Sequence, residues 1–203
     1  PHGCDVSPTG EYIVGSGKLA ALILVFSYDK MLKAIAAKSF DGEFDGIPVI
    51  KYEAALYGEV KKPGLGPLHT EFDDNGNAYT SMFVSSEVVK WNIKDLKVLD
   101  RQPTFYSIGH LCVVGGDTKK PAGKYLIAYN KITKDRYLPT GPELTQSAQL
   151  FDISGEKMKL ILDFPTIGEP HYAQAVLASV IKDKSLKMFK IEENQHPYAA
   201  KGE

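Results

Sequence analysis

Four of the five histidines in this 203-residue chain stand in similar sequence surroundings. His2, His69, His110 and His171 each lie within two residues after a proline or glycine, and each begins a stretch that reads as a β-strand. A repeated fold that places one imidazole at the same point of successive repeats brings these imidazoles together. Converging neutral imidazoles bind transition metals, and an all-nitrogen donor set favours copper or zinc over calcium or magnesium.

The segments after these histidines repeat an order of strand, tight turn, strand, short connection and strand. Turns of the Ser-Pro-Thr-Gly and Asp-Asp-Asn-Gly kind supply the preset or positive φ that hairpins need. A four-stranded propeller blade takes roughly 40–50 residues. The interval from His69 to His110 fits one bare blade, and the two longer intervals fit blades with insertions. The pattern therefore predicts an all-β partial propeller with the histidines directed inward.

Two insertions and one fading repeat interrupt this pattern. Residues 49–58 favour a short helix, whereas residues 30–38 fit either a helix or a strand followed by a turn. Residues 133–147, rich in proline and polar side chains, predict a surface loop. After His171 the pattern fades into two weaker strand candidates, at 173–179 and 185–191.

Charge and hydropathy exclude two classes of protein. The net charge is −1 with acids and bases mixed along the chain, so no nucleic-acid face is predicted. No apolar run approaches the roughly 20 residues of a membrane helix. A propeller closes by pairing its first and last blades. Because the chain starts at Pro1, beside the predicted strand of His2, we expect a piece of a longer protein, whose localisation its own first residues do not reveal.

Cys4 and Cys112 each lie two residues after a histidine of the set. Residues two apart on a strand share a face, so both thiols are expected to point inward beside an imidazole. The simplest role is that of a small, soft side chain on a narrow inner strand, and an additional metal ligand is the alternative. A disulfide between them is not expected, because the repeat of His69 separates them.

A metal-free explanation stays open at this point. Inward histidines could be structural residues of a propeller that serves as a binding or scaffold module. Each buried imidazole would then need its own hydrogen-bonding partner, and the repeats would share no reason to keep the same residue. His196 lacks the turn-then-strand surroundings and is expected to be a solvated tail residue.

The ordered set of phrases around the four histidines resembles the nitrous-oxide reductase family, copper enzymes that reduce N2O to N2. The phrases are Pro-His-Gly, Gly-Pro-Leu-His-Thr, Ile-Gly-His and Glu-Pro-His. Segments between them, such as those at 77–80, 88–93, 134–136 and 151–155, are also similar to the family, so the resemblance covers essentially the whole chain. Residues 108–112 and 141–146 resemble the branch exported by the general secretion route.

The resemblance implies a seven-bladed propeller followed by a cupredoxin domain. Residues 1–203 would form about four blades of that propeller, with the upstream blades and the cupredoxin domain, which carries the CuA centre, outside this sequence. The propeller axis of the family holds CuZ, a four-copper, sulfide-bridged cluster with seven histidine ligands. The last four of those ligands match His2, His69, His110 and His171.

The resemblance also assigns neighbours to the cluster. Lys131 and Glu169 match residues beside the edge where substrate binds, and Glu169 would share a strand face with His171. Their alternatives are an exposed strand-end lysine and a rim carboxylate. Calcium is possible near the cluster through main-chain oxygens around Lys131 and the following loop, but residues 140–146 depart from the pattern of the other branch and no calcium ligand is assigned.

The implied function is the two-electron reduction of N2O to N2 and water, the last step of denitrification, in the periplasm. The family works as a homodimer in which CuA of one subunit faces CuZ of the other, with an electron donor such as a c-type cytochrome or a cupredoxin. Expressed alone, the 203-residue chain is expected to be inactive and prone to aggregate, because an open arc of blades leaves sheet faces and edges uncovered.

Overall fold

The computed structural model describes residues 1–131, 146–166 and 168–182, and its core is three four-stranded antiparallel sheets in a row. In the first blade the strands pair in the order β1, β2, β3, β6. They are β1 (Cys4–Val6), β2 (Tyr12–Ser16), β3 (Leu22–Ser27) and β6 (Leu56–Lys61). The second blade contains β7 (Pro67–Phe72), β8 (Asn77–Met82), β9 (Glu87–Asn92) and β10 (Val98–Pro103). The third contains β11 (Ile108–Val113), β12 (Tyr125–Asn130), β13 (Ser147–Asp152) and β14 (Lys159–Pro165).

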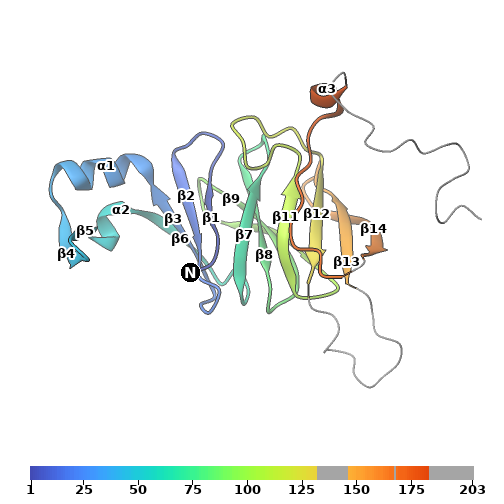
Figure 1. Cartoon of the computed structure of the whole chain (residues 1–203), viewed down its shortest axis with the longest axis horizontal. Coiled ribbons are helices and arrows are strands. Elements are labelled where there is room, and N and C mark those ends of the chain that lie inside the picture. The colour runs from blue at the N-terminus through green and yellow to red at the C-terminus, as the bar shows by residue number, and fades with distance from the viewer. Residues whose placement is uncertain (132–145, 167, 183–203) are drawn as a thin grey trace, which may run out of the picture.

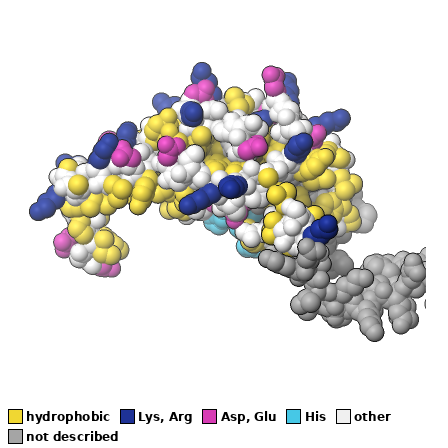
Figure 2. Space-filling view, turned by 90° about the horizontal axis from the view of Figure 1, so that it is seen from above, with side chains coloured by type: hydrophobic (Ala, Val, Ile, Leu, Met, Phe, Trp, Pro, Cys, Tyr) yellow, Lys and Arg dark blue, Asp and Glu magenta, His cyan; other side chains and the backbone are white. Residues whose placement is uncertain are grey.

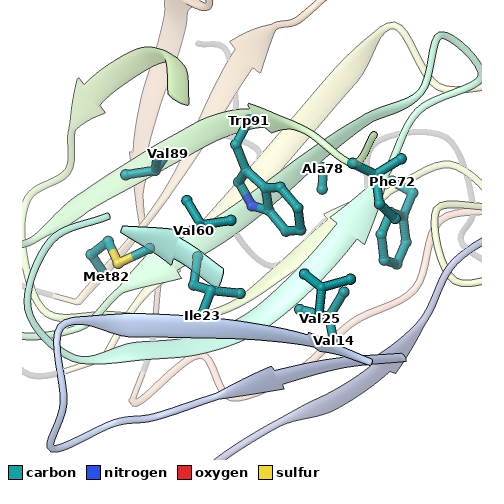
Figure 3. Close-up of a cluster of buried hydrophobic side chains, with 10 residues drawn as sticks. Val14, Ile23, Val25, Val60, Phe72, Ala78, Met82, Val89 and Trp91 are labelled. Carbon is teal, nitrogen blue, oxygen red and sulfur yellow. The ribbon is translucent and has the colours of Figure 1, made fainter. Parts of the chain in front are cut away.

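The blades stack face to face, with the first strand of each blade next to that of its neighbour. Strand β7 contacts both β1 and β11 (Figure 1). Alternating apolar residues of the blades fill the spaces between the sheets. Between the first and second blades, Val14, Ile23 and Val25 meet the fully buried Trp91 (Figure 3). A second core joins the second and third blades, so the predicted all-β partial propeller is confirmed.

The turn between β7 and β8 shows why the sequence repeats as hairpins. Gly76 has φ 79°, a conformation that L side chains rarely adopt, directly after Asn75. The buried Asp73 carboxylate accepts hydrogen bonds from the backbone N–H groups of Asn75 and Asn77 at 2.8 and 2.9 Å. It also accepts one from the hydroxyl of Tyr79, at 2.9 Å. One side chain therefore fixes the turn and ties it to the core.

The insertion between β3 and β6 forms an arm that extends away from the blades (Figure 1). It consists of α1 (Tyr28–Ala36), the ribbon β4 (Phe40–Phe44) and β5 (Ile47–Ile50), and α2 (Tyr52–Ala55). The Ser27 hydroxyl caps α1 by accepting from the N–H of Lys30. Of the two alternatives for residues 30–38, the structure shows the helix. The short helix expected within 49–58 is confirmed, although only its middle is helical.

Other expectations are corrected or fall outside the described residues. Residues 173–179 form no strand; irregular backbone leads instead into α3 (Ala178–Ile181). The strand candidate at 185–191, most of the loop at 133–147, and His196 lie outside the described residues. The described part contains four sheets, of which three are four-stranded blades and one is the two-stranded ribbon of the arm. It contains no helix that is both long and apolar enough to cross a membrane.

Candidate metal centre

The four predicted histidines converge at one end of the inner strands. His69 is the third residue of β7, His110 is the third residue of β11, and His2 precedes β1. His171 belongs to no strand and lies in the irregular segment after β14. The Nε2 atoms of His2 and His69 are 3.2 Å apart, and the rings of His69 and His110 stack with centroids 3.7 Å apart. The ring of His171 lies 4.9 Å from that of His110.

Local irregularities of the sheets direct two of these rings. The pairing of β7 with β8 shifts register between Pro67 and Thr70, and that of β11 with β12 shifts between Ile108 and Leu111. His69 and His110 lie inside these shifts. A β-bulge bends a strand and re-aims its side chains, and such bulges are common beside functional sites. The two blades therefore use the same device at the same position.

Two glycines next to the histidines allow the close approach. Gly3 has φ 78°, and a Cβ there would overlap the carbonyl oxygen of Leu68, so only glycine lets the chain after His2 lie against β7. A Cβ on Gly109 would overlap the methylene chain of Lys131. Gly109 therefore leaves the space through which Lys131 reaches the histidines.

The imidazoles of His2, His69 and His110 are held in their neutral form. Burial, followed by the neighbouring imidazoles and Lys131, lowers the pKa of His69 to about 3. Burial and the charge of Lys131 lower the pKa of His110 to about 4. The pKa of His2 is also lowered, first by burial and then by the charge of Lys18. Neutral imidazole is the form that has a free lone pair for a metal.

The hydrogen bonding of the rings is incomplete. Since the closest atoms of His2 and His69 are both Nε2, one ring must donate and the other accept, so the two have different tautomers. His110 Nδ1 is buried and has no hydrogen-bond partner in the described part of the chain. An unpaired buried nitrogen is costly in a finished core, whereas metal ligation would satisfy it.

Lys131 and Glu169 both lie beside His171. The Lys131 Nζ atom is 3.3 Å from His171 Nδ1 and 3.8 Å from Glu169 Oε1, and its side chain is only 11% exposed. Glu169 Oε1 is 3.7 Å from His171 Nδ1. Burial lowers the pKa of Lys131, while Glu169 acts in the opposite direction. The expected shared strand face of Glu169 and His171 is wrong, because residues 168–177 form no strand.

The contact between Lys131 and His171 restricts how His171 could act. A protonated lysine only donates, so His171 Nδ1 accepts and the ring proton resides on Nε2. A metal on Nδ1 would displace Lys131, and a metal on Nε2 would require the ring proton to move to Nδ1. Either way Lys131 is released from His171, and Glu169 is the carboxylate within reach.

The imidazole nitrogens are ligand atoms of the type that copper prefers, but they are not arranged around one metal ion. Within the described ranges, no three histidine, cysteine, aspartate or glutamate side chains are arranged to hold one metal ion. The rings are instead associated pairwise, from His2 through His69 and His110 to His171. This arrangement is compatible with a group of several ions, each held by few ligands of this chain. Figure 2 shows the histidines gathered on one side of the molecule.

The cysteines behave differently from each other. Cys112 is buried as expected, and burial raises the pKa of its thiol. Cys4 is exposed, so its expected inward position is wrong: the chain between His2 and β1 turns at Gly3, and the two residues do not share a strand. Both thiols are free, which confirms the absence of a disulfide between them.

Sequence reasoning missed two neighbours of the histidines. Tyr172 packs edge-on against His110, with ring centroids 5.1 Å apart. Its position directly after His171 was a usable signal. Lys18 lies in the turn between β2 and β3, where its backbone N–H donates to the carbonyl oxygen of Pro67 at 3.1 Å. No histidine is its neighbour in sequence, so only the pairing of blades could reveal it.

Comparisons with known proteins agree with this architecture. A family model described as "Nitrous oxide reductase propeller repeat" matches residues 101–171. Nitrous-oxide reductase from Stutzerimonas stutzeri is 38% identical over 92% of this chain and 29% of its own length. That from Cupriavidus necator is 41% identical over 84% of this chain and 27% of its own length. The chain therefore spans less than a third of these relatives.

A solved structure shows likeness in fold alone. Hydrazine synthase from Kuenenia stuttgartiensis superposes with a TM-score of 0.51 at 13% identity, covering 79% of this chain and 36% of the other. The family relationship rests on the set of sequence matches, not on this structural likeness. They identify the chain as a relative of the nitrous-oxide reductases, aligned with a segment that includes the propeller repeat of that family.

Proposed function

We propose that this chain supplies part of the N2O-reducing centre of a nitrous-oxide reductase. In the whole protein, His2, His69, His110 and His171 would be four of the ligands of CuZ, a tetranuclear copper–sulfide cluster. The observation that carries the proposal is the convergence of four imidazoles, three from successive blades and one from the irregular segment after β14. The three from the blades have a lowered pKa. The sequence similarity, which covers nearly the whole chain, supports the same assignment.

The reaction is N2O + 2 H⁺ + 2 e⁻ → N2 + H2O. A copper cluster supplies the electrons and a binding surface for a weakly coordinating molecule, and the protein fixes geometry and electrostatics. Uncharged imidazoles add no negative charge to the site. Bulged strands of a packed sheet hold two of the rings, His69 and His110, more rigidly than a surface loop would.

Lys131 is the residue best placed to respond to the charge that develops on oxygen. Its side chain is mostly buried, so its charge is less screened than that of a surface lysine. Ligation of His171 would free Lys131 to donate a hydrogen bond to the departing oxygen. Glu169, 49% exposed and within 3.8 Å of Lys131, would hold the ammonium group in place and connect it to solvent protons.

The remaining components belong to the whole protein. We propose a periplasmic homodimer in which a CuA centre on a cupredoxin domain delivers electrons, received from a c-type cytochrome or a cupredoxin. Calcium near the cluster is part of the same proposal, but the loop at 140–146 lies outside the described residues. The family resemblance implies these elements, and no contact among the described residues bears on them.

The test uses the full-length protein, expressed with copper and the maturation machinery. We expect copper by elemental analysis, and loss of N2O reduction in each of the variants His69→Ala, His110→Ala and His171→Ala. His196→Ala is the matched control and should keep wild-type activity. Full activity in any of the three ligand variants would exclude the ligand role. A folded protein without copper would favour a metal-free binding or scaffold propeller.

A further inference from the structure

The turn between β2 and β3 brings a second lysine to the candidate metal centre. The turn belongs to the first blade but docks onto the second, because the Lys18 N–H donates to the carbonyl oxygen of Pro67 at 3.1 Å. Pro67 is two residues before His69. On the other side, the backbone N–H of His2 donates to the carbonyl oxygen of Ser16 at 2.7 Å. The turn is therefore fixed between two of the four histidines.

The backbone of Lys18 is unusual but does not mark the residue by itself. Its φ is 32°, in the left-handed region that favours glycine. Lys38 shares this property with φ 52°, yet it lies on the arm, after α1. The positive φ thus reflects the turn geometry. The two lysines differ in their surroundings, because Lys18 lies beside the histidines and Lys38 lies on the arm.

The charge balance around the histidines is positive. Lys18 and Lys131 both act electrostatically on His2, and Lys18 also acts on Lys131. Glu169 is the carboxylate seen within 4 Å of this group among the described residues, and it is half exposed. Two lysines therefore act on this group, and only Lys131 is paired with the carboxylate among the described residues.

We infer that Lys18 is a second cationic residue of the candidate centre, which raises the reduction potential of the metal group bound by the histidines. This inference rests on the proposed function. A positive charge near a metal stabilises the reduced, less positive state relative to the oxidised one. Lys18 is exposed, so its influence passes through a partly solvated path and weakens as salt is added.

The division of roles between the two lysines follows from their burial. Lys131 lies in contact with His171 and can donate to a bound group. Within the described part of the chain, Lys18 is held through its backbone N–H, and the residue is exposed. Lys18 would act on the metal through the electric field of its charge and not by direct contact. Its removal should therefore change the reduction potential more than it changes proton transfer to the substrate oxygen.

The experiment is a redox titration of the copper-loaded, full-length protein, followed by the absorbance of the copper centre. We expect Lys18→Met to shift the midpoint potential downward and Lys18→Arg to leave it at the wild-type value. The shift should shrink as ionic strength is raised from 20 mM to 500 mM, values chosen so that the screening length falls from roughly 20 Å to roughly 4 Å. Lys38→Met is the matched control, with the same change of charge and side chain at another positive-φ position, and should not shift.

The outcomes separate this inference from the proposed function. Absence of copper from the wild-type protein would contradict the proposed function. Copper-loaded Lys18→Met with the wild-type potential at low salt would overturn the role of Lys18 and leave the ligand assignment intact. If Lys18→Met fails to load copper, Lys18→Gln provides the same loss of charge with a polar side chain, and an unchanged potential there is equally contradictory.

Discussion

The imidazole rings of His69 and His110 stack at 3.7 Å between centroids and 18° between planes, although the residues belong to different blades. Each ring sits in a register shift of its own blade, and the two inner strands that carry them are in contact. Stacking at this distance leaves no room for water between the rings. Burial is the largest cause of the low pKa of each of these histidines.

The first prediction concerns acid stability of the metal-free protein. The pKa of His69 is about 3 in the folded state and 6.5 in the unfolded state, so between these values the unfolded state binds more protons. The contribution of His69 to the free energy of unfolding is therefore fully present above pH 6.5 and is lost as the pH falls towards 3. Because the His69 ring is only partly buried, solvent screening reduces the loss from His69 between pH 7 and pH 4.5 to about 1–2 kcal/mol.

The measurement is urea unfolding of the copper-free protein at several pH values. His69→Gln should flatten the dependence of the free energy of unfolding on pH in this range. A control with His196→Gln should leave the wild-type slope. If His69→Gln and the wild type lose stability in parallel, His69 is not the neutral, buried imidazole described above.

The second prediction concerns Lys131. Lys131→Met removes the ammonium group but keeps most of the aliphatic chain that packs on Gly109. If Lys131 donates to the departing oxygen, kcat for N2O reduction should fall about 10²-fold, the usual effect of removing one such donor. Copper content should be unchanged. The control is Lys124→Met, at an exposed lysine directly before β12, the strand that Lys131 follows. Equal activity of the two variants would exclude Lys131 as the hydrogen-bond donor.

Much of this architecture was predictable because hairpins and inner strands leave local signals. Asn75 and Gly76 mark a turn through backbone conformation alone, and the spacing of His69 and His110 is the length of one blade. The sequence also identified the four histidines as one set. The position of Lys18 could not be predicted, since it depends on which turn of one blade meets which strand of the next.

The failures share a cause. Cys4 was expected to face inward and Glu169 to share a face with His171, and both expectations assumed an unbroken strand through the residues concerned. Gly3, with φ 78°, turns the backbone between His2 and Cys4, and residues 168–177 form no strand at all. Two-residue periodicity holds only within a strand, so it does not predict the orientation of residues that lie before or after the strand.

The third prediction concerns the core between the first two blades. Trp91 is fully buried among residues of both sheets, and its indole N–H donates to Thr80 Oγ1 at 2.9 Å. Trp91→Ala should lower the free energy of unfolding by about 3–5 kcal/mol, through lost contacts and a cavity that the stacked sheets cannot close. Leu99→Ala, at a side chain that is 48% exposed, should cost far less in the same denaturation series. Similar losses in both variants would contradict the described packing.

The fourth prediction concerns Asp73, whose carboxylate joins the β7–β8 turn to the core. Asp73→Ala leaves the N–H groups of Asn75 and Asn77 and the buried hydroxyl of Tyr79 without their acceptor. Unsatisfied buried donors cost about 1–3 kcal/mol each, and the exposed ones can turn to water, so we expect a total loss of about 2–4 kcal/mol. Asp74→Ala, one residue away and exposed, should change stability by less than about 0.5 kcal/mol.

A double-mutant cycle with Tyr79→Phe isolates the buried part of this interaction. Tyr79→Phe removes the hydroxyl that Asp73 would otherwise leave unpaired, so the double variant should be more stable than the sum of the single losses implies. A coupling of about 1 kcal/mol or more between the two changes is expected. Strict additivity would mean that the hydroxyl of Tyr79 finds another partner, and that Asp73 holds the turn alone rather than linking it to the core.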